Sequence, residues 1–277
     1  MPVPPSAVAG AYARLTEVFP GLTVTVTDPG EPVPEGDGWT RASSLTSDGA
    51  ALDAFLARDA EQVLRDYGTR ARPDVVAGFG LHRYAWPACL LFTVPWFLYR
   101  RVPRLPVTHV SYDRAAGRMA VRPVSFACLP GDPAAALPGA RVADGAEALR
   151  AEVRAAVAEH LEPVLGGFGP RMRRRGRALW GMATDEIAEG LWYVARLLGE
   201  EDRALRELDL LLPGATPPYA GSAAFRELTG PDGERLPTRD RAGCCLFYTV
   251  RAEDTCVTCP RTRDADRIAG LVAASAR

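Results

Sequence analysis

Apolar residues in the first hundred positions recur at intervals that predict several elements. Residues 5–18 have weak helical spacing, and residues 22–27 alternate with β-branched side chains, as in a strand. Residues 51–67 carry apolar side chains at helical intervals, which predicts an amphipathic helix. The longest apolar run, residues 85–99, predicts a buried helix over 82–100, because it is shorter than the roughly 20 residues that a membrane helix needs.

After the apolar run the pattern predicts two strands and then mostly helices. The two strands lie within 107–126 and are joined by a turn at 114–117, and a loop rich in proline and glycine covers 129–145. Helices are predicted over 146–165, from Pro170 to about 199, over 201–212, and in the tail after 260. Residues 213–240 contain many turn formers and are predicted to be a connector.

These elements predict an α+β fold, with an N-terminal mixed α/β part followed by a mostly helical C-terminal half and a cysteine-rich segment. We expect a body over residues 1–240, which contains strands in 1–140 and is helical in 141–240. We expect residues 241–277 to form a separate C-terminal cluster-binding segment.

Composition excludes several classes of protein. Hydrophobic residues make up 47% and charged residues 24%, and Lys+Arg 33 against Asp+Glu 34 gives a net charge of -1, which is typical of a soluble globular protein without affinity for nucleic acid. All basic residues are arginines, so mechanisms that use a lysine are excluded. The N-terminus lacks a basic head and an apolar stretch, so we expect a cytoplasmic protein with at most peripheral membrane contact through arginines near the apolar run.

Four of the six cysteines lie between positions 244 and 259, in the pattern C-C-x10-C-x2-C. Four thiolates suit either tetrahedral zinc or an iron–sulfur cluster. Structural zinc sites usually use two C-x2–4-C knuckles, and the adjacent cysteines at 244 and 245 do not form one. Spacing therefore favours a [2Fe–2S] cluster, and zinc or a redox-active disulfide pair remain as alternatives.

This cysteine pattern, near the C-terminus of a chain of this length, resembles the FhuF family of [2Fe–2S] ferric-siderophore reductases. A looser similarity covers residues 160–163 and 177–181, and little of it extends into residues 1–140. The resemblance implies that a [2Fe–2S] cluster is ligated by Cys244, Cys245, Cys256 and Cys259.

The resemblance also implies a function. The expected reaction transfers one electron from the cluster to the iron(III) of a siderophore, of the hydroxamate class, and releases iron(II) in the cytoplasm. Because no G-x-G-x-x-G motif is present, we expect a separate ferredoxin-like electron donor. Two alternatives remain open: a zinc-stabilised binding domain, and a FhuF-like protein linked to siderophore biosynthesis.

Other residues give weaker signals. A dense basic run is a candidate docking site for an acidic carrier or an anionic siderophore, or else a solvated helix face; it comprises Arg171, Arg173, Arg174, Arg175 and Arg177. The isolated histidines, His82, His109 and His160, are more typical of packing or hydrogen bonding than of metal ligation. Cys89 and Cys128 are expected to be buried.

Overall fold

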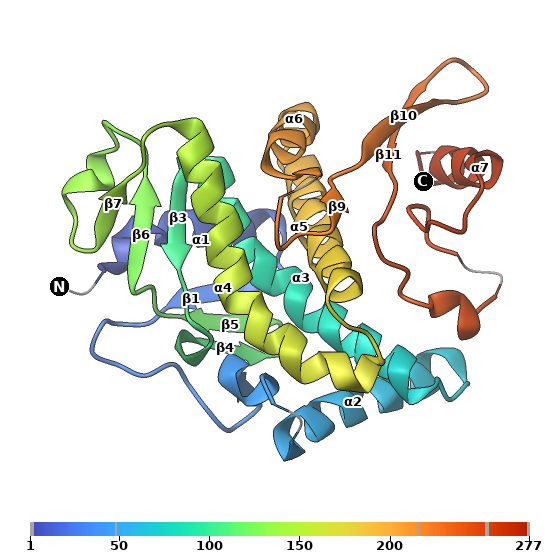
Figure 1. The fold of residues 1–277 in the computed structure, drawn as a ribbon, viewed down its shortest axis with the longest axis horizontal. Coiled ribbons are helices and arrows are strands. Elements are labelled where there is room, and N and C mark those ends of the chain that lie inside the picture. The colour runs from blue at the N-terminus through green and yellow to red at the C-terminus, as the bar shows by residue number, and fades with distance from the viewer. Residues whose placement is uncertain (1–2, 48, 215, 253–254, 276–277) are drawn as a thin grey trace.

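The computed structural model describes residues 3–47, 49–214, 216–252 and 255–275 (Figure 1). The α-helices are α1 (Ala9–Val18), α2 (Ala50–Tyr67), α3 (Pro73–Tyr99), α4 (Ala146–Met172), α5 (Arg177–Leu197), α6 (Glu201–Leu211) and α7 (Asp264–Ser275). Short 3-10 helices are η1 (Pro5–Ala7), η2 (Ala42–Leu45), η3 (Val107–His109), η4 (Pro133–Ala136) and η5 (Phe247–Thr249). The strands are β1 (Thr23–Val26), β2 (Trp39–Arg41), β3 (Arg101–Arg104), β4 (Val110–Asp113), β5 (Arg118–Val121), β6 (Ser125–Cys128), β7 (Ala140–Val142), β8 (Pro213–Gly214), β9 (Gly221–Ser222), β10 (Phe225–Thr229) and β11 (Arg235–Arg239).

Helix α3 forms the centre of the hydrophobic core. It packs against α1, α2, α4 and α5, and most of its side chains are buried, including those of Trp96 and Phe97. The predicted apolar helix is therefore confirmed, but it begins at Pro73, nine residues before the expected start. Among the described residues, no helix is sufficiently long and apolar to span a membrane.

The strands of the N-terminal half form two small sheets. Strands β1, β5, β4 and β2 form one sheet in that order, and β3, β6 and β7 form the other. The predicted hairpin is confirmed as β4 and β5, which pair antiparallel from Val110 with Val121 to Asp113 with Arg118. The second predicted strand is split, because Pro123 lacks a backbone N–H, and its last residues form β6 in the other sheet.

The boundary between α4 and α5 differs from the prediction. Helix α4 continues through Pro170 to Met172, and α5 begins only at Arg177. The buried side chains of Phe168 and Met172 hold the last turn of α4 against the core. The chain then leaves the helix at Arg173, which has a left-handed conformation with φ 55°.

Residues 213–240 are not a plain connector. They contain the short β8–β9 pair and an antiparallel hairpin of β10 and β11, in which Phe225 pairs with Arg239. Figure 1 shows this hairpin, the cysteine segment and α7 on one side of α5, with the N-terminal sheets on the other side. The cysteine segment therefore connects the hairpin to α7 on the same side of α5 (Figure 1).

The α+β class is confirmed, with small sheets in the N-terminal part and the cysteines near the C-terminus. The division into residues 1–240 and 241–277 stays a prediction.

Candidate metal centre

The four cysteines of the C-terminal segment lie on two short turns. Cys244 and Cys245 lie five and six positions after the end of β11, and the chain turns at Leu246, which has a left-handed conformation with φ 63°. Cys256 and Cys259 lie on a tight turn in which the Cys259 amide donates a hydrogen bond of 2.9 Å to the Cys256 carbonyl. Each turn presents two sulfur atoms from a short stretch of chain.

The sulfurs lie as two pairs, each with one cysteine from each turn. The Cys256 thiol donates a hydrogen bond to the Cys245 sulfur, which lowers the pKa of Cys245 and raises that of Cys256. The Cys244 thiol donates to the Cys259 sulfur; burial, more than this bond, raises the pKa of Cys244. All four thiols are free, and Cys259 is buried whereas the others are half-buried. Two thiolate pairs are the donor set that two iron atoms require.

Backbone amides point at three of these sulfurs. The amides of Leu246 and Phe247 donate to Cys244 and Cys245. The Arg261 amide lies 3.5 Å from the Cys259 sulfur. Amide donors of this kind stabilise thiolate charge and tune iron–sulfur clusters. The residues present therefore fit a [2Fe–2S] cluster, although within the described ranges no three ligating side chains already surround a single metal position.

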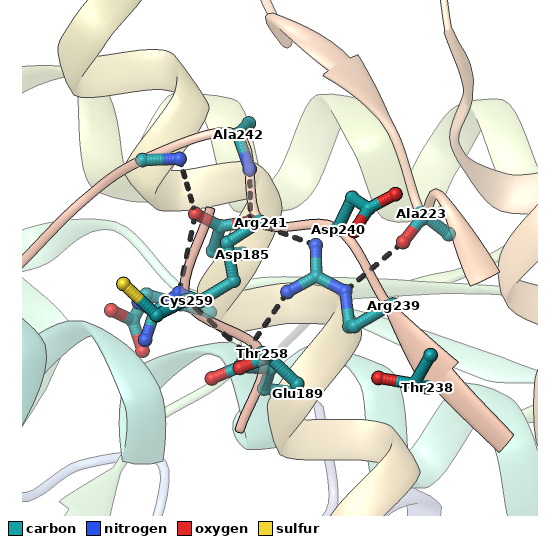
Figure 2. A network of polar contacts seen from close by, with 12 residues as sticks. Asp185, Glu189, Ala223, Thr238, Arg239, Asp240, Arg241, Ala242, Thr258 and Cys259 are labelled. Atoms are coloured by element: carbon teal, nitrogen blue, oxygen red, sulfur yellow. Dashed lines mark hydrogen bonds and ion pairs between the residues drawn. The ribbon is translucent and has the colours of Figure 1, made fainter. Parts of the chain in front are cut away.

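Asp185 on α5 holds the chain immediately before the cysteines (Figure 2). Its carboxylate accepts hydrogen bonds from the amides of Ala242 and Gly243, at 2.9 and 2.7 Å. It also pairs with Arg239 at 2.7 Å, and neither side chain of this pair is exposed. Asp185 thereby fixes the end of β11 and the approach to the first cysteine pair.

Glu189, one helical turn after Asp185, holds the second turn. Its Oε1 accepts a hydrogen bond of 2.8 Å from the Thr258 hydroxyl, which lies between Cys256 and Cys259 in sequence. The same oxygen pairs with Arg239 at 3.1 Å. Two carboxylates on one helix face therefore position both cysteine turns.

Two arginines fix the cysteine segment from other elements. Arg174, in the loop between α4 and α5, donates a hydrogen bond of 2.7 Å to the Cys244 carbonyl. Arg267 on α7 is buried and donates to the carbonyls of Cys259 and Arg239, at 3.2 and 3.1 Å. The predicted tail helix is thus present and contacts the cysteine segment directly.

Positive charge surrounds the Cys245 and Cys256 pair. Arg241 is largely buried and lies 3.6 Å from carboxylate oxygens of both Asp185 and Glu189. After the hydrogen bond from Cys256, the charge of Arg241 also lowers the pKa of Cys245. Positive charge near the sulfurs favours electron acceptance, so this arginine is expected to raise the reduction potential of a bound cluster.

His82 on α3 is a second group whose positive charge lowers the pKa of Cys245, after the larger effect of the hydrogen bond from Cys256. Its Nδ1 lies 2.8 Å from Oε2 of the buried Glu186. The charge of Glu186 raises the pKa of His82, so this histidine carries a proton over a wider range of pH. The pairing of His82 with Glu186, 104 positions away, was not indicated by the isolated position of this histidine in the sequence.

The five arginines of the predicted docking run do not act as one group. Arg173, Arg175 and Arg177 are exposed near the cysteine segment. Arg174 turns inward onto Cys244, and Arg171 forms an ion pair of 2.6 Å with a carboxylate on α2. The exposed basic surface therefore contains three of the five arginines: Arg173, Arg175 and Arg177.

The remaining candidates are structural. Cys89 and Cys128 are buried in the hydrophobic core, as predicted. His160 is buried and hydrogen-bonded to Leu105 and Tyr84, and His109 lies 2.9 Å from Arg122. They contact none of the four clustered cysteines in the bonds that the structure describes for them.

Sequence reasoning missed the acidic residues of α5. Asp185, Glu186 and Glu189 lie within a helix whose other buried positions, apart from Thr184, are apolar or glycine. Carboxylates are rarely buried without a partner. Acidic residues among the apolar positions of a predicted helix were therefore the one sign in the sequence that buried cationic partners exist. Asp185 and Glu189 pair with Arg239, 54 and 50 positions away, and Glu186 pairs with His82, 104 positions away, so the pairing itself could not be deduced.

Residues 241–261 match the family model described as FhuF 2Fe-2S C-terminal domain. The resemblance to the FhuF family is confirmed. The matched segment contains all four clustered cysteines, and together they fit a [2Fe–2S] cluster, as predicted. Comparisons with curated proteins and with solved structures found no match. The FhuF match supports an iron–sulfur protein with a role like that of a siderophore-iron reductase.

Proposed function

We propose that this FhuF-like protein is a cytoplasmic ferric-siderophore reductase that releases iron(II) from a hydroxamate siderophore. Cys244, Cys245, Cys256 and Cys259 ligate its [2Fe–2S] cluster. The observation that carries the proposal is the FhuF match over these four cysteines. Their enclosure by the buried groups of α5 and α7 supports it.

The chemistry of the substrate agrees with the cofactor. Hydroxamate oxygens bind iron(III) far more tightly than iron(II), so a single electron releases the metal. When bound, a [2Fe–2S] cluster supplies one electron at a time. The residues of this chain hold the thiolates in place, donate amide hydrogen bonds to sulfur and set the charge around them.

The electron donor is a ferredoxin-like protein with an acidic surface. Arg173, Arg175 and Arg177 form an exposed basic surface beside Arg174, which is bonded to Cys244. Charge complementarity speeds the encounter of two proteins and weakens as salt increases. The donor therefore docks close to the first cysteine pair.

The test of the function uses the purified protein and an iron(II)-trapping dye. We expect a red-brown protein whose visible absorption bleaches with dithionite and returns when a ferric hydroxamate is added, with one iron(II) trapped per electron. A colourless protein with stoichiometric zinc would overturn the proposal. A cluster that reduces no ferric siderophore would instead favour a role in siderophore biosynthesis.

The donor surface is tested separately. Replacement of Arg175 and Arg177 by glutamate is expected to slow reduction by an acidic ferredoxin at least tenfold at low salt, while reduction by dithionite is unchanged. Arg206→Glu, at an exposed position on α6, is the matched control. Equal rates for both variants would overturn this docking surface.

A further inference from the structure

A cavity of about 530 Å³ opens beside the cysteine segment, between the end of α1, helices α2 and α3, and η5. Six of its thirteen lining residues are aromatic: Phe19, Tyr67, Phe79, Trp86, Tyr112 and Phe247. The lining also includes the polar side chains of Gln62, His82, Arg83 and Arg114. Cavities that hold organic ligands combine apolar contact surface with polar groups that fix the orientation of the ligand, and this cavity offers both.

The cavity and the cysteine turn share one wall. Phe247 is two residues after Cys245, and its amide donates to the Cys245 sulfur. Its ring packs against those of Tyr67 and Phe79, with centroids 5.2 and 6.0 Å apart. A molecule in the cavity that contacts the Phe247 ring therefore contacts a residue whose own amide is hydrogen-bonded to the Cys245 sulfur.

The charged groups of the cavity nearly balance. Arg83 and Arg114 share the buried carboxylate of Asp59, at 2.6 and 2.8 Å. His82 pairs with the buried Glu186. Two arginines thus share one carboxylate, which leaves one positive charge for a ligand on this side of the cavity. A ligand with several negative charges would lose its hydration here without enough partners.

The geometry points to this cavity as the binding site of the electron acceptor, an iron(III) chelate that is neutral or carries a single negative charge and has an apolar organic periphery. The aromatic rings contact the periphery, and the positive side of the cavity contacts the oxygen-rich metal centre. One electron passes from the reduced cluster to iron(III), which becomes iron(II), and the ferredoxin-like donor replaces it. This inference rests on the proposed function and adds where the substrate binds and which charge it carries.

Binding is tested with a chelate that cannot be reduced. Gallium(III) ferrichrome is a neutral trihydroxamate complex, and its affinity is measured by calorimetry on the cluster-loaded protein. Tyr67→Ala and Trp86→Ala are expected to weaken binding at least tenfold with an unchanged visible spectrum. Tyr99→Ala is the matched control, because Tyr99 is 45% exposed and does not line the cavity. Wild-type affinity in both cavity variants, or an equal loss in the control, would overturn the site.

The charge of the bound chelate is tested with a variant of Gln62, whose Oε1 accepts a hydrogen bond of 2.7 Å from Arg114. Gln62→Glu keeps an acceptor at this position and cancels the surplus positive charge. We expect little change for the neutral gallium chelate and at least a tenfold loss for a singly negative one. A trianionic gallium tris-catecholate is expected to bind wild type at least tenfold more weakly than the neutral chelate. Binding as tight as that of the neutral chelate would overturn the charge assignment.

The two proposals fail in different ways. If wild type and both cavity variants reduce ferric ferrichrome equally, the site is wrong and the reductase function stands. If wild type reduces no ferric siderophore but binds the gallium chelate through Tyr67 and Trp86, the reductase function is wrong and the site stands.

Discussion

The Asp185 carboxylate and the Arg239 guanidinium form an ion pair of 2.7 Å in which neither side chain is exposed. Asp185 lies on α5, and Arg239 is the last residue of β11. The pair joins the helical body to the hairpin that precedes the cysteines. Because the same carboxylate binds the amides of Ala242 and Gly243, stability and cofactor retention depend on one side chain.

Asp185→Ala is therefore expected to destabilise the protein by about 3–5 kcal/mol, since it leaves a buried guanidinium without its main partner. The same change releases the two amides that position the cysteine turn, so the iron content should fall as well. Urea unfolding and iron analysis measure the two effects. Asp266→Ala, which removes an exposed carboxylate from α7, is the control and should change neither. A stable variant with full iron content would contradict this role.

Gly243 lies where the chain passes closest to α5. A Cβ atom there would lie 3.0 Å from Cγ of Met182 and 3.2 Å from Oδ2 of Asp185. Gly243→Ala is expected to push the cysteine turn away from the helix and to lower the amount of iron bound per chain. Gly30→Ala, at a position with no atom within 4 Å of the added carbon, should bind iron as wild type does. Equal iron content in both variants would show that the turn tolerates this displacement.

The cysteine turns were predictable because their ligands are close in sequence. The spacing of Cys244, Cys245, Cys256 and Cys259 favours a [2Fe–2S] cluster, and the resemblance to the FhuF family implies one, without knowledge of the fold. Helical periodicity likewise predicted α2, since one local pattern determines which face is buried, whereas α3 was predicted from its continuous apolar run.

The hairpin and the ionic network were not predictable in the same way. Residues 225–239 contain many polar and turn-forming residues, and β11 is buried through Thr238 and Arg239 rather than through a run of apolar side chains. Arg239 is buried only because Asp185 and Glu189 lie opposite. Such long-range charge pairing leaves no periodic signal in the sequence.

The roles of the six cysteines predict a sharp division among variants. Cys244→Ser, Cys245→Ser, Cys256→Ser and Cys259→Ser should each remove most of the iron and sulfide, because each cysteine pair supplies the two thiolates for one iron atom. Cys89→Ala and Cys128→Ala should retain both, since these thiols are buried in the hydrophobic core. Iron, sulfide and visible absorption are measured for all six. Loss of the cluster in Cys89→Ala would contradict the ligand assignment.

Arg267 connects α7 to the second cysteine turn. Arg267→Gln removes hydrogen bonds to the carbonyls of Cys259 and Arg239 and leaves these buried acceptors unsatisfied, at a cost of about 1–3 kcal/mol. We expect faster loss of visible absorption in the presence of an iron chelator. Arg263→Gln, four residues away on the chain and 83% exposed, is the control. Equal rates of loss for the two variants would exclude a role of α7 in retaining the cluster.

His160 makes the stability of the body dependent on pH. Its Nδ1 donates to the Leu105 carbonyl at 2.7 Å, so Nε2 accepts the hydrogen bond from the Tyr84 hydroxyl, also at 2.7 Å. Burial of this neutral ring lowers the pKa of His160 from 6.5 to about 4. The unfolded chain therefore binds a proton between pH 6.5 and about 4 that the folded chain does not bind, and the stability falls as the pH falls through this window.

Over the whole window this histidine should reduce the free energy of unfolding by about 3 kcal/mol, since each pKa unit corresponds to about 1.36 kcal/mol. His160→Gln cannot take up the proton but keeps one donor and one acceptor. Carboxylates titrate in both proteins, so the difference between wild type and variant isolates the imidazole. Urea unfolding at pH 7 and pH 4 should show wild type losing about 3 kcal/mol more than the variant. Equal losses would mean that His160 is protonated in the folded state at pH 4 without cost.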